Sequence, residues 1–421
     1  MLTVRQAVFT VVAPIPHSGL AALREAVATI RHDPAGNELL PFGRFDIVHF
    51  ASLILAEDLE PSPLLILELN ADGTAPSCLA ALLAGAGPGL DALFASSEGY
   101  PGHADLPAAK AWLEQHIVRP GAYHIGATGR THDRIRDETR LHEAIQAFLD
   151  AEEKAGRLVG VTPATLRAGV QDFVRGDPSL AWARTSPPRQ TSVARAMHWA
   201  RFVGAIVAVL VLLPILLPVL FVAVVLLRLK ERTDKVQVGQ PDDAHVRRLQ
   251  DEEDFAAQNH LSSVIPIKPG VLRMVVLRGV LLAINLVARV LAVNGRLGDI
   301  PSIHFAHWSM INDNRHLLFV SNFDGSWESY LGDFIDKASY GLTAVWSNTV
   351  DFPRTRFLAF DGAADGPRFR AWARAKQCST NAWYTAYPAA TMATIDNNTS
   401  IREGLFATLD GEGTAAWLAR L

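Results

Sequence analysis

The sequence contains little cysteine and no strong excess of charge of either sign. Its 421 residues include two cysteines, Cys78 and Cys378, which stand far apart and have no partners at metal-ligand spacing. This argues against a disulfide framework and favours reducing, cytosolic surroundings. The formal net charge is −4 and 19% of the residues are charged, so no nucleic-acid partner is expected.

The short motifs that identify common enzymes are also absent. The sequence has no P-loop, GxGxxG, HExxH, GxSxG or paired CxxC motif. Its first residues, MLTVRQAVFTVVAPIP, lack a basic segment followed by a long apolar one. They predict a β-strand rather than a signal peptide.

The most prominent feature that is present is an apolar run in the middle of the chain. Phe202–Leu227 contains 26 residues and no charge, and about 20 apolar residues suffice to cross a bilayer as a helix. The run therefore predicts attachment to a membrane.

The two ends of the chain resemble each other, which predicts an internal repeat. Val48–Ala51 (VHFA) matches Ile303–Ala306 (IHFA), and Leu65–Gly73 (LILELNADG) matches Leu317–Gly325 (LLFVSNFDG) at an offset of 252 residues. Later matches keep the same order at an offset of 260 residues: Trp112 with Trp372, Thr131 with Thr391, and Ile135 with Ile395.

Each copy is expected to run strand, strand, helix, strand, helix, which is the split β-α-β pattern of a ferredoxin-like module. Two such modules commonly pair their sheets face to face. The expected fold class is therefore α+β, with two ferredoxin-like repeats forming an intramolecular α+β barrel and a membrane-embedded helical insertion between them. The predicted boundaries are 1–180 for the first repeat, 181–299 for a membrane hairpin, polar linker and amphipathic membrane helix, and 300–421 for the second repeat.

The apolar run has to return the chain to the side of the membrane from which it entered, because a single crossing would place the two repeats on opposite sides. Pro214 and Pro218 lie at its centre, where they bend or break a helix. We expect a re-entrant hairpin with both repeats on the cytoplasmic side of the membrane; a full span is the alternative. Basic residues flank both ends, as the cytoplasmic side favours: Arg184, Arg189, Arg195, Arg201, Arg228, Lys230, Arg232 and Lys235.

The second apolar segment, Val271–Val293, has a different pattern. Arg278, Arg289 and Arg296 fall on one face of a helix, and apolar residues fill much of the remainder. This predicts an amphipathic helix in the membrane interface with its arginines toward lipid phosphates. Two ordinary transmembrane helices would also return the chain to its starting side.

The candidate site residues lie in the second repeat. His304 and His307 share a predicted strand, and alternation should send them to opposite faces, so that one points into the barrel as a ligand or acid–base group. Arg354 and Arg356 form a pair that could bind an anion, and Asp324 precedes a glycine at a turn. Each also has an ordinary structural use. The aromatic residues of this half form a core or an apolar substrate cavity: Trp346, Trp372, Trp383, Tyr384 and Tyr387.

The repeat resembles the dimeric α+β barrel superfamily, which includes dye-decolorising peroxidases and chlorite-dismutase-like haem proteins. The stretches QNHLSSVIPIKPG, IHFAHW and LLFVSNFDGSWESYLGDFIDK also resemble bacterial membrane-associated members of this type over roughly residues 251–405. The resemblance implies haem, with His304 or His307 as its ligand. The chain departs from the peroxidase GxxDG motif, because Ser321 stands in place of the first glycine before Asp324-Gly325.

Three functions are compatible with these features. The first is a membrane-associated, haem-dependent oxidoreductase, peroxidase- or oxygenase-like, in which a histidine ligates iron and an arginine stabilises an anionic oxygen. The second is a cofactor-free membrane module that binds a lipid or a partner. The third is a cofactor-independent monooxygenase. Membrane lipid and an apolar small molecule are the expected partners, and the oligomeric state stays open.

Overall fold

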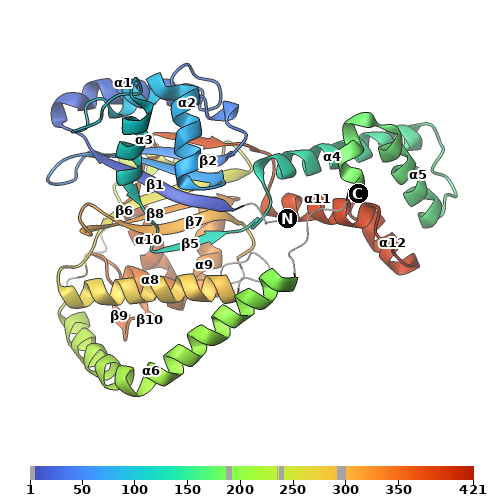
Figure 1. The fold of residues 1–421 in the computed structure, drawn as a ribbon. Coiled ribbons are helices and arrows are strands. Elements are labelled where there is room, and N and C mark those ends of the chain that lie inside the picture. The colour runs from blue at the N-terminus through green and yellow to red at the C-terminus, as the bar shows by residue number, and fades with distance from the viewer. Residues whose placement is uncertain (1–4, 186–191, 235, 237–240, 292–299) are drawn as a thin grey trace.

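Two five-stranded antiparallel sheets form the centre of the protein, and helices cover their outer faces (Figure 1). The computed structural model describes residues 5–185, 192–234, 236, 241–291 and 300–421. The coarse prediction of a mixed α+β fold is therefore confirmed.

The first sheet has the strand order β12-β2-β3-β1-β4. Its strands alternate between apolar residues that face outward and a mixture of polar and apolar residues that face the other sheet. The strands are β1 (Gln6–Pro14), β2 (Val48–Ala56), β3 (Leu64–Asp72), β4 (Ile117–Val118) and β12 (Ala382–Thr385). Three helices pack on the outer face: α1 (Leu20–His32), α2 (Ala75–Phe94) and α3 (Leu106–Gln115).

The second sheet has the equivalent order β11-β6-β8-β7-β5. Its strands are β5 (Ala122–Ile125), β6 (Gln258–Pro266), β7 (Ile303–Ile311), β8 (His316–Asp324) and β11 (Gln377–Cys378). Its outer face is covered by α8 (Val271–Leu291), α9 (Trp327–Trp346) and α10 (Gly366–Lys376). The sheet therefore extends beyond residues 300–421, because β6 pairs with β8 along nine residues.

The two halves of the chain exchange one strand each. β5 follows the first sheet in sequence but pairs with β7, and β12 follows the second sheet but pairs with β2. The matching helices α2 and α9 both have 20 residues, and each has a kink at the same place, at Ala86 and at Ala338. The order of elements in one half is thus reproduced in the other, and each half has more strands and helices than the expected strand, strand, helix, strand, helix.

The inner faces of the two sheets pack against each other. At one end of the interface the contact is apolar, with Ile54, Leu64 and Ile66 of the first sheet meeting Leu318 and Val320 of the second. Towards the other end, fully buried polar residues replace the aliphatic ones. The sheets are therefore joined by a core that is partly polar.

Four further helices pack beside the sheets (Figure 1). They are α4 (His132–Lys154), α5 (Pro163–Gly176), α11 (Met392–Leu405) and α12 (Gly411–Leu418). Four short segments of the described residues form 3₁₀ helices: His17–Gly19, Phe42–Arg44, Pro178–Arg184 and Gly362–Ala364.

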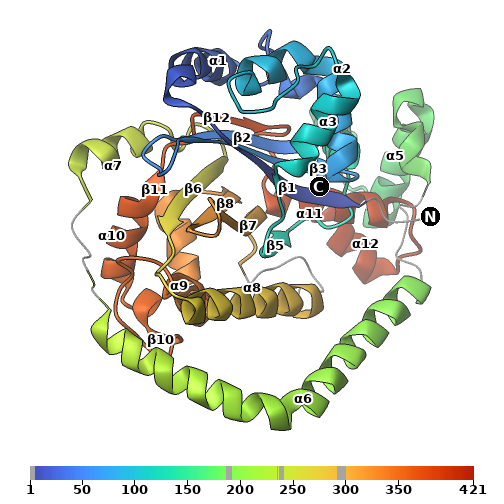
Figure 2. The same ribbon diagram turned by 60° about the vertical axis from the view of Figure 1, so that its left-hand side comes forward.

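The insertion between the halves begins with one long helix, α6 (Ser192–Thr233), which contains both Pro214 and Pro218. Figures 1 and 2 show that α6 bends about halfway along and that the bend points away from the sheets. The short helix α7 (Asp243–Gln250) follows, and the small hairpin of β9 (Thr355–Arg356) and β10 (Phe360–Asp361) lies beside α6 and α9.

One helix among those whose side chains are fully described, α2, is long and apolar enough to cross a membrane by length and composition. More than half of it is buried against the first sheet, as the core helix of a soluble domain would be. The side chains of α6 are described only in part. Of the arginines predicted to line α8, Arg278 is exposed, whereas the side chain of Arg289 and the whole of Arg296 lie outside the described residues.

Candidate functional site

His304 and Asp324 form a buried pair at the polar end of the space between the sheets. The ring nitrogen Nε2 of His304 lies 2.6 Å from Asp324 Oδ1. The other carboxylate oxygen, Oδ2, accepts a hydrogen bond of 2.7 Å from the backbone N–H of Met392, the first residue of α11. Asp324 thus joins the ring of His304 to the amino end of α11 and fixes the orientation of the histidine.

The first half of the chain contains an equivalent pair. His49 Nε2 lies 3.1 Å from Asp72 Oδ1, and Asp72 Oδ2 accepts from the backbone N–H of His132, the first residue of α4, at 2.8 Å. The two pairs share an aromatic centre, in which the rings of Phe50 and Phe305 are 5.7 Å apart. We call His49–Asp72 and His304–Asp324 the two His–Asp pairs.

The ring of Tyr387 contacts both histidines, but its hydroxyl bonds to the first pair. Its hydroxyl lies 2.9 Å from His49 Nδ1, and burial raises the pKa of Tyr387 well above its ordinary value. The hydroxyl therefore keeps its proton and donates to His49 Nδ1, which leaves Nε2 to donate to Asp72. Tyr387 corresponds to Ala127 in the repeat, so the two pairs are not chemically equivalent.

A bulge at the start of β7 decides which way the histidines point. The register between β7 and β8 shifts between Ile303 and Phe305, so that His304 and Phe305 both contact Phe50 of the other sheet. His307 also faces that sheet, with Nε2 3.1 Å from Thr10 Oγ1. The prediction that His304 and His307 lie on opposite faces is wrong, because the extra residue of a bulge interrupts strand alternation.

His307 belongs to a second polar group, deeper between the sheets. Burial lowers the pKa of His307 to about 3 and that of His260 to about 4, so both rings are neutral at neutral pH. On the facing strand, burial raises the pKa of Glu68 to about 8. Among the described residues, His260 Nε2, His307 Nδ1 and Asn322 Nδ2 have no hydrogen-bond partner. Buried polar atoms usually have a partner, so these three are exceptions within the core between the sheets.

Arg354 and Arg356 are separated from these histidines. Both are exposed at the β9–β10 hairpin, where Arg356 lies 3.7 Å from Asp361 and over the ring of Phe360. None of the contacts described for His304 or His307 involves either arginine. The structure thus brings together His304, Asp324 and, nearby, His307, and places the arginine pair beside α6 instead.

An apolar cavity of about 40 Å³ lies between the second sheet and the helices α9 and α10. Trp346 and Trp372 line it, as one interpretation of the aromatic residues predicted, whereas Tyr387 packs with His49 and Trp383 bonds to Asn322. Ser263 and Tyr330 supply its few polar atoms, and neither His–Asp pair reaches it.

The residues present do not fit a histidine-ligated haem. The Nε2 atom of His304 is held by Asp324 and that of His307 by Thr10. Pockets for ligands of that size span about 300–1,000 Å³, and neither histidine lines the apolar cavity of about 40 Å³. No reaction step is therefore assigned to haem.

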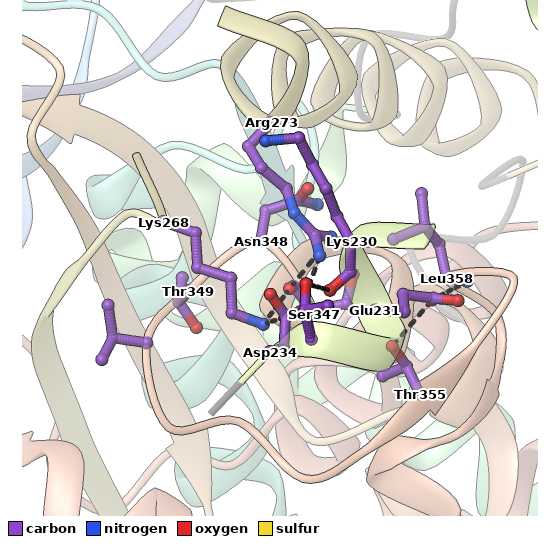
Figure 3. Close-up of polar contacts among 12 residues, drawn as sticks. Lys230, Glu231, Asp234, Lys268, Arg273, Ser347, Asn348, Thr349, Thr355 and Leu358 are labelled. Atoms are coloured by element: carbon purple, nitrogen blue, oxygen red, sulfur yellow. Dashed lines mark hydrogen bonds and ion pairs between the residues drawn. The ribbon is translucent and has the colours of Figure 1, made fainter. Parts of the chain in front are cut away.

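The carboxyl-terminal end of α6 is fixed to the second half by buried charges. Lys268 Nζ and Arg273 donate to the same atom, Asp234 Oδ2, at 2.7 and 2.6 Å, and Lys268 also donates to the carbonyl oxygen of Ser347 at 2.9 Å (Figure 3). Arg273 is almost fully buried. We call Asp234, Lys268, Arg273 and Ser347 the α6 anchor.

Glu231, one turn before Asp234, holds the tip of the β9–β10 hairpin. Its carboxylate accepts from the backbone N–H groups of Phe357 and Leu358 at 2.9 and 2.8 Å (Figure 3). Burial opposes ionisation of Glu231, but these and other hydrogen bonds outweigh it and lower its pKa. Phe357 and Leu358 have φ values of 54° and 59°, a strained conformation for bulky residues that the carboxylate helps to maintain.

Sequence reasoning named His304 and Asp324 but missed His49 and Asp72. The signal was present, because both copies of the repeat contain the HFA and DG motifs. No protein-family model, no curated protein and no solved structure matches the chain. Its function is therefore inferred from the arrangement of its own residues.

Proposed function

We propose that the protein is a membrane-attached module that binds lipid, with its two sheets held against the cytoplasmic face of the membrane. In this proposal α6 enters the membrane as a bent hairpin and α8 lies in the interface. The sheets form an intramolecular α+β barrel of two ferredoxin-like repeats. The observation that supports the proposal best is the distribution of exposed apolar side chains.

Twenty-one large apolar side chains are exposed in the described residues, and ten of them belong to α6 and five to α8. Soluble proteins rarely expose contiguous apolar patches larger than a few hundred Å², so this surface needs a cover. The fifteen residues are Val203, Val207, Val211, Leu217, Phe221, Val222, Val224, Val225, Leu226, Leu229, Val271, Val275, Leu282, Leu286 and Val287.

The dimensions of α6 favour a hairpin over a span. At 1.5 Å per residue, the arm from Phe202 to Pro214 is about 18 Å long and the arm from Pro218 to Leu227 about 14 Å. The hydrocarbon core of a bilayer is about 30 Å thick, so a helix bent at the prolines enters it without crossing. Both ends of α6 lie nearer the sheets than its bend does (Figures 1 and 2).

The β9–β10 hairpin adds residues typical of a membrane interface. Phe357 and Phe360 are exposed, and the guanidinium groups of Arg228 and Arg356 lie 5.3 and 5.7 Å from the centres of their rings. Aromatic rings and long basic side chains gather at the level of lipid headgroups. The proposal places Arg354 and Arg356 opposite lipid phosphates, which is the anion-binding role their pairing suggested.

The two enzymatic alternatives have less support from the geometry. A haem-dependent oxidoreductase needs a histidine with a free nitrogen next to an open pocket. Nδ1 of His307 has no hydrogen-bond partner, but neither His304 nor His307 lines the apolar cavity. A cofactor-independent monooxygenase needs a base beside a shielded cavity. Neither His–Asp pair lines the apolar cavity.

Flotation with liposomes tests the membrane attachment. Leu217 and Phe221 are 55% and 70% exposed on α6, and Val159, between α4 and α5, is 88% exposed. A charge at the centre of the bilayer costs about 2.5–3.5 kcal/mol. The double variant Leu217→Asp/Phe221→Asp should therefore float poorly, and the matched control Val159→Asp should float like the native protein. Equal flotation of all three would refute the role of α6, and lipid co-purifying with the native protein, detected by mass spectrometry, would support binding.

Cysteine labelling in cells separates a hairpin from a span. Asp177→Cys and Asp243→Cys lie before and after α6, in a background where Cys78 and Cys378 are replaced by alanine. With a hairpin, neither position reacts with an impermeant thiol reagent added outside, and both react after the membrane is permeabilised. Labelling of one position and not the other from outside would show that α6 crosses the membrane.

A further inference from the structure

Three potential metal ligands meet at the start of α4, outside the two His–Asp pairs. His132 and Asp133 are the first two residues of the helix, and Asp46 lies just before β2. One donor atom from each of the three lies within 4.8 Å of the others. His132 Nδ1 and Asp133 Oδ1 are 3.2 Å apart.

The spacing of His132 Nδ1 and Asp133 Oδ1, which a hydrogen bond joins, also suits a transition-metal ion. Bonds from zinc to imidazole nitrogen and to carboxylate oxygen are about 2.0–2.2 Å long, which separates neighbouring ligand atoms by about 3.0–3.5 Å. The His132–Asp133 distance falls within that interval. Asp46 and Asp133 are exposed, so their carboxylates can adjust around the nearly buried ring of His132.

A neighbouring cation, Arg136, is paired with one of the three residues only at the surface. Arg136 lies 3.3 Å from Asp46. That ion pair is well exposed and therefore weak, so a dication can displace it.

The repeat provides an internal comparison. The first two residues of α11, which match His132 and Asp133, are Met392 and Ala393, and Pro301 matches Asp46. None of these three can donate through a carboxylate or an imidazole. The ligand set is thus specific to the first half, although the backbone is shared.

We propose that Asp46, His132 and Asp133 bind a divalent transition-metal ion, for which Zn²⁺ is the probe. One nitrogen and two oxygen donors leave at least one coordination position for water or a small anionic ligand. The backbone N–H of His132 donates to Asp72, so the ion would also fix the start of α4 and, through it, the His49–Asp72 pair.

Titration of the metal-stripped full chain with Zn²⁺, without a polyhistidine tag, tests the proposal. Binding of one ion should weaken at least tenfold in His132→Ala and in Asp46→Asn. Asp137→Asn, which removes an exposed carboxylate one turn further along α4, should bind as the native protein does. Because His132→Ala can disturb the helix start, Asp46→Asn, which lies outside α4, provides the decisive comparison.

The outcome is independent of membrane attachment, which flotation of the same variants measures. Zn²⁺ should raise the melting temperature of the native protein and of Asp137→Asn, but not that of Asp46→Asn. Native affinity in Asp46→Asn and His132→Ala, or equally weak binding in every variant, would overturn the proposal.

Discussion

The α6 anchor should hold the membrane helix to the folded part of the protein, and Asp234→Ala is the change that tests it. Asp234 Oδ2 is the shared acceptor of Lys268 and Arg273, so the substitution removes the only carboxylate that both contact among the described residues. Ser347 keeps its carbonyl oxygen near Lys268. The two cations would then repel each other without a counter-charge.

The size of the effect follows from burial. The side chain of Arg273 is 2% exposed and that of Lys268 is 13% exposed. Removing one partner of a buried ion pair costs about 3–5 kcal/mol, because the remaining charge stays buried and unpaired. Asp172→Ala is the matched control: its ion pair with Arg175 is at the surface, where such pairs contribute about 0–1 kcal/mol.

Thermal denaturation in detergent, followed by tryptophan fluorescence, measures the difference. Four of the nine tryptophans, Trp308, Trp327, Trp346 and Trp372, are buried in the core of the second half, so the emission changes when that core unfolds. We expect a much lower melting temperature for Asp234→Ala than for Asp172→Ala. Equal melting temperatures would refute the assignment of the α6 anchor as a buried, stabilising contact.

Three further predictions follow from buried or closely packed residues. Burial raises the pKa of Glu68 from 4.5 to about 8, so between these pH values the folded state holds a proton that the unfolded chain has lost. The free energy of unfolding should therefore fall as the pH rises from about 4.5 to about 8, by up to about 1.4 kcal/mol per pH unit. Denaturation at several pH values should show this fall in the native protein and not in Glu68→Gln. A Cβ atom at Gly89 would lie 1.9 Å from the carbonyl oxygen of Leu39, so Gly89→Ala should strongly lower the melting temperature. The control is Gly169→Ala on α5, where a Cβ atom would have nothing within 4 Å. This variant should not lower the melting temperature, because alanine favours a helix more than glycine does. Protein expressed with added haem should lack a Soret band, since His304 is bound to Asp324; a band that disappears in His304→Ala would contradict the fit described above.

Much of the local structure could be predicted from the sequence. The apolar run lies within one helix, α6, and Val271–Leu291 forms α8. The strands containing the repeated HFA and DG motifs occupy equivalent places in the two sheets. These features depend on the composition and periodicity of adjacent residues, which a single sequence displays directly.

The position of α8 shows where local pattern stops being sufficient. Its apolar residues suggested a helix lying in the interface, but Leu277 and Leu281 are buried in the core of the second half, while Val275 and Leu282 are exposed. A helix with apolar residues on most of its faces can pack against protein and lipid at once. Periodicity alone does not distinguish these two uses.

By itself, then, the sequence determined the helices of the two apolar segments, α6 and α8, the repeated strands and the identity of His304 and Asp324 as candidates. Only the tertiary structure decided that a bulge turns His304 and His307 to the same side, that β5 and β12 exchange sheets, and that Arg354 and Arg356 lie at α6 instead of beside the histidines. The physical reason is range. Helix and strand periods arise between neighbours along the chain, whereas register shifts, strand partners and buried charge pairs depend on contacts between residues distant in sequence.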